Sequence, residues 1–333
     1  MARDIGIDLG TANVLIHVKG RGIVLDEPSV VAIEKQTGRV MAVGEEAFRM
    51  VGRTPGNIVA IRPMKDGVIA DFEQTEAMLK HFLNKINVKS MFSKPRILIC
   101  CPTNITSVEQ KAIREAAEKS GSKNVYLEEE PKVAAVGAGM DIFQPSGHMV
   151  VDIGGGTTDV AVLSMGDVVT ASSIKVAGDQ FDQDILNYIK KKYKLLIGVR
   201  TSEAIKMEVA TVSPSGREAE MEIRGRDMVS GLPRTISITA SEIYGSLMES
   251  ASHIVQAAKS VLERTPPELS ADIIDRGVIL TGGGALIHGI DELLADELKV
   301  PVMIAEEPMH CVANGTGIML ENLDRLSNKK ATL

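Results

Sequence analysis

Two stretches of the chain, residues 5–16 and 149–162, share one pattern of residue types. Each has an apolar run, an aspartate, a turn that contains glycine, a threonine and a second apolar run. Because glycine has no side chain, successive backbone N–H groups in such a turn can converge on an anion. Asp8 and Asp152 precede the two turns, where a phosphate-bound Mg²⁺ needs an acidic partner. A single hairpin of this kind is more often an ordinary tight turn.

The repetition favours a binding site over two ordinary turns. Asp8 and Gly10 align with Asp152 and Gly154, and the second turn is two residues longer. Each stretch is predicted to form a β-hairpin. Two such hairpins that face each other would hold a triphosphate and its metal ion from both sides.

Composition excludes several other classes of function. The 333 residues suffice for one large or two medium domains with an ample core. Aromatic residues make up 3% of the chain and tryptophan is absent, which argues against platforms that stack bases or sugars. The net charge of −7 predicts no general affinity for nucleic acids. The three cysteines and six histidines show no metal-ligand spacing, and we expect neither a signal peptide nor a membrane-spanning segment.

The remaining elements alternate between strands and helices, which is typical of an α/β protein. Expected helices cover residues 45–51, 72–87, 106–121, 133–139, 178–192, 201–210, 241–264, 287–298 and 309–326. Residues 34–72 are predicted to form a small α/β insertion, and residues 211–240 two or three antiparallel strands. A third glycine turn, at 282–284, follows an apolar strand.

Commoner nucleotide motifs do not fit these turns. The sequence contains no G-x-x-x-x-G-K-[ST], and the glycine pairs at 137–139 and 282–284 lack the third glycine of a dinucleotide fingerprint. The order observed is an Asp hairpin, Glu130-Pro131, a second Asp hairpin and a strand that runs into three glycines. This order resembles the actin-like ATPase superfamily of actins, sugar kinases and seventy-kilodalton heat-shock chaperones.

Within that superfamily, longer motifs resemble the MreB/Mbl family of bacterial cell-shape proteins. These motifs are Asp-Leu-Gly-Thr-Ala-Asn at 8–13, Glu-Glu-Pro at 129–131, Asp-Ile-Gly-Gly-Gly-Thr-Thr-Asp at 152–159, Gly-Leu-Pro-Arg-Thr at 231–235 and Leu-Glu-Arg-Thr-Pro-Pro-Glu-Leu at 262–269. The resemblance covers residues 3–325. Cys-Cys-Pro-Thr-Asn at 100–104 and Lys132, where MreB proteins usually carry an apolar residue, favour the Mbl branch.

The resemblance implies an actin-like α/β fold, with two duplicated lobes of mixed sheet and helices around a nucleotide cleft. Each lobe is expected to carry a small inserted subdomain. The expected limits are 1–33, 73–143 and 309–333 for the first large subdomain, 34–72 for the first small one, 144–176 and 241–308 for the second large one, and 177–240 for the second small one.

The resemblance also implies a site for ATP or ADP with Mg²⁺. Asp8 and Asp152 would hold the metal ion through water molecules, and Glu130 would orient the attacking water. The phosphate loops would contain Gly10, Thr11, Ala12 and Asn13 in the first hairpin and Gly154, Gly155, Gly156 and Thr157 in the second. The adenosine would lie between Glu203 and Lys206 and against Gly282, Gly283, Gly284 and Ala285.

Ordinary structural roles compete with two of these assignments. Glu130 has the place of a carboxylate that stabilises a helix N-terminus, and Glu203 and Lys206 have the spacing of a solvated surface pair. Spacing alone favours these ordinary roles, and only the resemblance reverses the choice.

The function implied by the resemblance is that of a weak ATPase with a cytoskeletal role. The family forms antiparallel double protofilaments on the inner face of the cytoplasmic membrane and works with MreC, MreD, RodZ and the elongation synthases. A plasmid-segregation filament is the nearest alternative. A small-molecule kinase would need a further acidic or histidine cluster, and a chaperone would need a β-rich peptide-binding domain after the ATPase part.

The loop at 88–96 is the expected membrane contact. Met91 and Phe92 are adjacent apolar residues flanked by Lys89, Lys94 and Arg96. An isolated apolar pair more often packs against its own domain. However, the first strand is expected to begin near residue 4, which leaves no room for an amphipathic anchor helix, and an apolar tip ringed by cations suits an anionic lipid surface.

Overall fold

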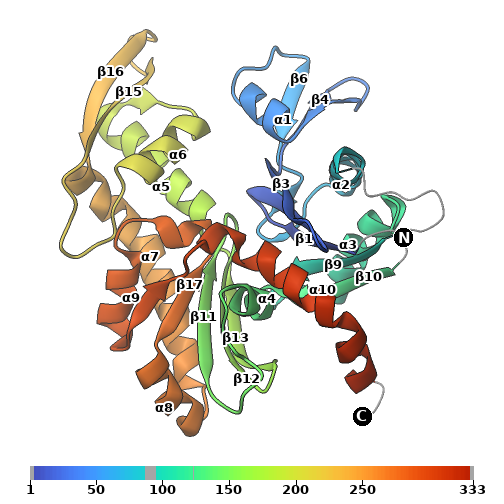
Figure 1. The fold of residues 1–333 in the computed structure, drawn as a ribbon. Coiled ribbons are helices and arrows are strands. Elements are labelled where there is room, and N and C mark those ends of the chain that lie inside the picture. The colour runs from blue at the N-terminus through green and yellow to red at the C-terminus, as the bar shows by residue number, and fades with distance from the viewer. Residues whose placement is uncertain (1–3, 87–94, 123, 331–333) are drawn as a thin grey trace.

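The computed structural model describes residues 4–86, 95–122 and 124–330. They form two lobes that lie side by side, each built on a five-stranded sheet with helices packed against it (Figure 1). The two-lobed α/β architecture implied by the resemblance is therefore confirmed. Met91 and Phe92, the residues expected at the membrane, lie outside the described residues.

The first lobe contains a mixed sheet in the order β10-β9-β1-β2-β3. β1, β2 and β3 are antiparallel neighbours, and β9 runs parallel to both β1 and β10. Its strands are β1 (Ile5–Leu9), β2 (Asn13–Val18), β3 (Gly22–Pro28), β9 (Arg96–Cys101) and β10 (Asn124–Glu129). The helices packed on it are α2 (Phe72–Lys85), α3 (Ser107–Lys119), α4 (Glu130–Gly137) and α10 (Cys311–Lys330).

Different helices cover the two faces of this sheet, as β9 shows. Ile97 and Ile99 share a core with residues of α2 and α3. Leu98 and Cys100 face the other way, toward residues of α10 and, for Cys100, also of α4. Because side chains alternate along a strand, a strand covered on both faces is apolar at nearly every position.

The second lobe repeats the topology of the first. Its sheet has the order β13-β12-β11-β17-β18, with three antiparallel strands followed by two that run parallel to β11. Its strands are β11 (His148–Ile153), β12 (Thr158–Ser164), β13 (Asp167–Ile174), β17 (Val278–Thr281) and β18 (Val302–Ile304). Its helices include α7 (Ala240–Glu263), α8 (Pro267–Arg276) and α9 (Ile290–Leu298).

Each lobe also carries a smaller three-stranded sheet, seen at the top of Figure 1. The first contains β4 (Val31–Glu34), β5 (Val40–Val43) and β6 (Ile58–Ile61), with α1 (Glu45–Met50) beside it. The second contains β14 (Leu195–Leu196), β15 (Glu220–Asp227) and β16 (Pro233–Thr239), with α5 (Gly178–Tyr193) and α6 (Val199–Glu208) beneath it. The short strands β7 (Met64–Lys65) and β8 (Val68–Ile69) pair separately. The subdomain limits given above remain a prediction.

Helices α4 and α10 pack against each other between the two lobes (Figure 1). Two glycines allow their backbones to touch. A Cβ atom at Gly137 of α4 would overlap the carbonyl oxygen of Cys311, and one at Gly315 of α10 would overlap the carbonyl oxygen of Val133. This close packing agrees with the small-residue helix expected at 133–139, and it fixes the helix that begins with Glu130.

Three elements differ from the sequence-based expectation. β3 and α8 correspond to no expected element, and α8 begins at Pro267, shortly after the helix expected at 241–264. The helix expected from residue 287 begins at Ile290, because a 3₁₀ turn, η1 (Gly283–Leu286), comes first.

Candidate functional site

A cavity of about 410 Å³ lies between the two lobes, and we call it the central cavity. Its volume falls in the range of small-molecule sites. The expected site residues that line it are Asp8, Gly10, Thr11, Ala12, Asn13, Glu130, Asp152, Gly154, Gly155, Gly156, Thr157, Glu203, Lys206, Gly282, Gly283 and Gly284. Ala285 is not among the described residues that line the cavity, and its side chain is fully buried.

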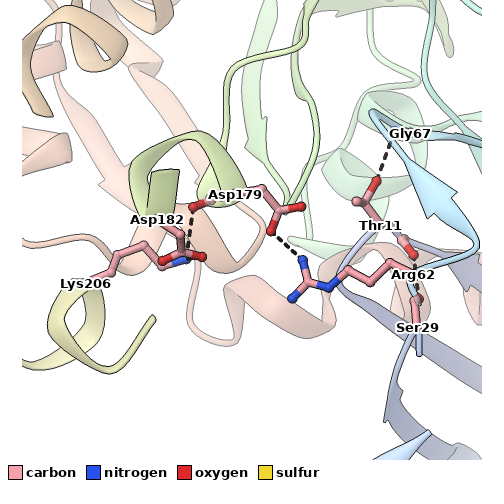
Figure 2. Close-up of polar contacts among 9 residues, drawn as sticks. Thr11, Ser29, Arg62, Gly67, Asp179, Asp182 and Lys206 are labelled. Atoms are coloured by element: carbon pink, nitrogen blue, oxygen red, sulfur yellow. Dashed lines mark hydrogen bonds and ion pairs between the residues drawn. The ribbon is translucent and has the colours of Figure 1, made fainter. Parts of the chain in front are cut away.

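The two Asp hairpins meet at one end of this cavity. A Cβ atom at Gly155 would lie 2.7 Å from the Cβ of Ala12, and one at Gly156 would lie 2.5 Å from Thr11 Oγ1. Glycine is therefore required for the second turn to approach the first so closely. Thr11 Oγ1 also accepts a 3.0 Å hydrogen bond from the Gly67 N–H, which ties the first turn to the connection between β7 and β8 (Figure 2).

The third glycine turn lies against the second hairpin. Gly282 has φ +81°, a conformation that favours glycine, and a Cβ atom there would overlap the carbonyl oxygen of Ile153. Just before this turn, Thr281 donates a 2.6 Å hydrogen bond from Oγ1 to Asp152 Oδ1. The buried Asp152 carboxylate is thereby oriented by the neighbouring parallel strand.

Carboxylates from both lobes line the cavity where the two hairpins meet. Loss of hydration, followed by the charge of Asp152, raises the pKa of Asp8 to about 8. Burial raises the pKa of Asp152 to about 6, although the hydrogen bond from Thr281 opposes the rise. Both shifts arise first from burial, and the charges of neighbouring carboxylates raise the two pKa values further.

This donor set fits Mg²⁺. Among the described residues, no group of three or more His, Cys, Asp or Glu side chains is placed to hold a metal ion. Magnesium usually takes one or two carboxylates and completes its octahedron with water and phosphate oxygens. Asp8 and Asp152 provide carboxylates of this kind on opposite hairpins.

Glu130 lies near Asp8 and Asp152, at the N-terminus of a helix. It is the first residue of α4, directly after β10, and its side chain lines the central cavity. Loss of hydration raises the pKa of Glu130 well above its ordinary value, and the negative charges of Asp152 and Asp159 raise it further. A cation near these groups would favour the ionised carboxylate that a general base requires.

The other end of the cavity combines polar and apolar residues. Glu203 and Lys206 lie on α6, and the Lys206 ammonium donates hydrogen bonds to Asp182 Oδ2 at 2.8 Å and to the Gly178 carbonyl at 3.0 Å. Sequence reasoning missed the apolar residues that line the cavity here and would suit a base; they include Met207, Leu286, Ile287, Pro308 and Met309. Their only sequence signal is their position next to Lys206 and to the third glycine turn.

Sequence reasoning also missed a polar contact between the lobes. Arg62, which follows β6, and Asp179, in the first turn of α5, form a 2.6 Å ion pair (Figure 2). Asp179 lines the central cavity, and its N–H donates a 2.8 Å hydrogen bond to the Gly155 carbonyl. The sequence predicts the helix at 178–192 but does not mark its first turn as part of the site.

A second cavity, of about 280 Å³, lies on the far side of α5, and we call it the side cavity. It is lined by Val30, Phe48, Val51, Ala60, Ile61, Arg62, Asp179, Asp182, Gln183, Leu186, Val199 and Arg200. The first turns of α5 therefore separate the two cavities.

In the part of the chain that the structure describes, no helix combines the length and the apolar character that a membrane crossing requires.

Sequence comparison relates the chain to a known family along nearly its whole length. A family profile described as "MreB/Mbl protein" matches residues 2–328. The chain is 80% identical to the cell shape-determining protein Mbl of Bacillus cereus over 98% of each chain, and 77% identical to that of Bacillus subtilis over 99% of each. It is 51% identical to the cell shape-determining protein MreB of Escherichia coli, over 97% of this chain and 94% of the relative.

Solved structures share the fold. MreB 5 of Spiroplasma citri bound to AMPPNP superposes with a TM-score of 0.93 at 41% identity, over 100% of this chain and 99% of that one. The ADP-bound form of that protein gives the same TM-score over 98% of this chain and 99% of that one, again at 41% identity. A MamK double helical filament, at 21% identity and a TM-score of 0.81 over 96% of this chain and 98% of that one, shares the fold alone.

Proposed function

The chain belongs to the MreB/Mbl family, and from that membership we propose that it is an ATP-binding, ATP-hydrolysing actin homologue that determines bacterial cell shape. In this proposal its filaments form on the inner face of the cytoplasmic membrane and direct peptidoglycan synthesis. Its partners are further copies of itself, the membrane, MreC, MreD, RodZ and the elongation synthases. The high identity to proteins named for cell shape favours this role over plasmid segregation.

The central cavity is the observation that carries the nucleotide part of the proposal. Two matching glycine hairpins approach each other within contact distance at one end, and apolar residues line the other end. A relative of the same fold, at 41% identity, is known in complex with AMPPNP and with ADP. We therefore place the phosphates between the hairpins and the nucleoside toward α6 and the third glycine turn.

The chain's own residues would divide the chemistry as follows. Backbone N–H groups of the two turns bind the phosphates. Asp8 and Asp152 would hold Mg²⁺ through water, and the ion would supply positive charge next to the phosphate oxygens. Glu130 accepts the proton of the attacking water, and the packed α4–α10 pair keeps its carboxylate in place.

The direct test uses purified protein with Mg-ATP, Mg-ADP or no nucleotide, in the presence of anionic liposomes. We expect phosphate release with Mg-ATP, and electron micrographs should show paired filaments lying on the vesicles. A protein that neither binds nor hydrolyses ATP would overturn the enzymatic part. Nucleotide binding without any filament would overturn the cytoskeletal part.

The cellular part has a separate test. Expression of this chain in rod-shaped Bacillus cells depleted of their own Mbl should restore rod shape. A control variant, Glu130→Ala, should be produced at the same level and should not restore it. Rounded cells despite normal production of the parent protein would contradict the shape-determining role.

A further inference from the structure

The ammonium of Lys206 is held by two fixed acceptors before any nucleotide arrives. It donates to Asp182 Oδ2 at 2.8 Å and to the Gly178 carbonyl oxygen at 3.0 Å (Figure 2). The side chains of Lys206 and Asp182 are 19% and 6% exposed. A lysine ammonium has three N–H donors, so one donor remains for a ligand in the central cavity.

Asp182 holds this lysine from behind the cavity wall. Lys206 lines the central cavity, whereas Asp182 lies one turn into α5 and lines the side cavity. The backbone of Asp182 is fixed as well, because its carbonyl accepts a 2.6 Å hydrogen bond from the fully buried Ser202 of α6. Asp182 thus joins α5 to α6 at two points, one of which is the ammonium itself.

The arrangement of Asp182 is poor for stability. Its second oxygen, Oδ1, is buried and has no hydrogen-bond partner among the described residues. An unpaired buried acceptor lowers the stability of a fold. Glu203 and Asp179 add negative charge, whereas Lys206 favours the ionised form of the carboxylate. The carboxylate is therefore better explained by what it does to Lys206 than by what it adds to the core.

We infer that Asp182 is a positioning residue, which fixes the Lys206 ammonium against the cavity wall and thereby sets the affinity for the nucleoside end of the nucleotide. The inference rests on the proposed nucleotide-binding function. A free lysine side chain samples many rotamers, and binding must restrict them. An ammonium that is already held in place avoids this loss and raises affinity through preorganisation.

The test measures binding of a fluorescent ATP analogue and steady-state hydrolysis in the full-length chain. Asp182→Ala and Asp182→Asn should each weaken nucleotide binding, the Ala variant by roughly tenfold. Hydrolysis at saturating ATP should stay within about twofold of the parent, because a contact made equally in ground and transition states changes KM and leaves kcat. Asp184→Asn is the matched control, since Asp184 lies on the same helix and bonds Gln180 and Ser250 instead.

A double-variant cycle identifies the route of the effect. If Asp182 acts through Lys206, Asp182→Ala combined with Lys206→Ala should bind no more weakly than Lys206→Ala alone. Additive losses, or Asp182 variants that bind as tightly as the parent, would overturn the inference and leave the proposed function standing. A parent protein that binds no nucleotide would instead overturn the proposed function itself.

The Asp182→Asn variant distinguishes a loss of folding from a loss of Lys206 positioning. Asp182→Asn keeps the shape of the side chain, and its thermal midpoint is expected to equal or exceed that of the parent near pH 8. Weaker nucleotide binding together with an unchanged or higher midpoint supports positioning. A lower midpoint with a proportional loss of both binding and turnover would show that Asp182 is structural, and would overturn the inference.

Discussion

Arg62 and Asp179 stand 117 positions apart in the chain and form a 2.6 Å ion pair that joins the two lobes. Arg62 comes from the edge of the small sheet of the first lobe, and Asp179 comes from the start of α5 in the second. Asp179 also lines the central cavity, so the pair joins the lobes beside the proposed nucleotide site. We expect the pair to separate when the lobes open to release a nucleotide.

Arg62→Gln should therefore speed nucleotide release. The two side chains are 26% and 37% exposed, so solvent screens the pair. A pair of this kind contributes up to about 1 kcal/mol, which limits the acceleration to roughly fivefold. Chase experiments with a fluorescent ATP analogue at low salt should show it, and high salt should shrink the difference. Arg39→Gln, which alters a surface pair at 4.0 Å, serves as control; identical release rates at low salt would remove the ion pair from the closing mechanism.

Glu130→Ala should impair hydrolysis and spare binding. Glu130 is the first residue of α4, and its side chain lines the central cavity. Loss of a general base lowers the rate by about 10²-fold or more. Phosphate release and nucleotide affinity are measured side by side, with Glu129→Ala as control, since Glu129 makes no side-chain cap bond to the helix. Unchanged phosphate release by the Glu130 variant would exclude Glu130 from the mechanism.

Asp152→Ala should weaken the binding of Mg-ATP much more than that of metal-free ATP, because its carboxylate faces the phosphate end where the cation is expected. Calorimetry with and without Mg²⁺ measures the loss of affinity for Mg-ATP and for metal-free ATP. Thr281→Val removes the 2.6 Å hydrogen bond to Asp152 but leaves the carboxylate, so it should retain the dependence on metal. Equal losses with and without Mg²⁺ in the Asp152 variant would point to a role in folding.

Nucleotide affinity should depend on pH through Asp182. Burial raises the pKa of this carboxyl to about 6, even though Lys206 opposes the rise. As the pH falls through 6, the carboxyl gains a proton and the ion pair with Lys206 is lost, so affinity should fall in the parent. In Asp182→Asn, this fall in nucleotide affinity at acid pH should be absent. Parallel titrations of the two proteins from neutral to acid pH measure it, and superimposable profiles would contradict it.

The same pKa fixes the sign of the effect on stability. At pH values between 3.8, the ordinary pKa of an aspartate, and about 6, the folded protein binds the proton of Asp182 more tightly than the unfolded chain does. The contribution of this group to the free energy of unfolding therefore increases as the pH falls through that window, and is lost above it. This is why Asp182→Asn is not expected to lower the thermal midpoint at neutral pH.

Changing Met91 and Phe92 to Ser should abolish co-sedimentation with anionic liposomes and leave hydrolysis and filament formation intact. The prediction rests on the sequence, in which an apolar pair stands among cations worth about 1 kcal/mol each near such lipids. One loop binds weakly, so attachment depends on many copies along a filament. The control changes Phe143 and Met165, an apolar pair that is 53% and 75% exposed, to Ser. A loop variant that still pellets like the parent would exclude this loop as the anchor.

Local patterns in the sequence were enough to predict the Asp hairpins and the long amphipathic helix α7. In each case the signal is contained within a short segment, such as the strand-Asp-glycine order around Asp8 or the helical spacing from Ile243 to Val261. The pairing of the two hairpins was also predictable, because the same order occurs twice. Such features need no knowledge of the tertiary structure.

Contacts between distant segments could not be predicted in this way. Nothing in the sequence near Arg62 or Asp179 indicates that they meet, and the acceptor behind Lys206 lies 24 positions earlier on another helix. The helix α8 was missed because Pro267 both follows one helix and opens the next, and proline is well tolerated in a first helical turn. Strand β3 was missed because it lies at the sheet edge, where Ile23 and Val24 are only partly buried and charged residues follow the buried Leu25.

The packing of α4 on α10 has a mechanical consequence. Within the described residues the chain passes from lobe to lobe at two places, after α4 and after β18, and the two glycine contacts hold these crossings together. Two adjacent crossings act as a hinge, which permits one rotation and resists sliding or twisting. The small sheets lie far from this hinge in Figure 1, so a rotation about the hinge moves them more than it moves residues near the hinge. A rotation too slight to displace Glu130 thus becomes a large change in the distance between those sheets, where a pair of spectroscopic labels would report it.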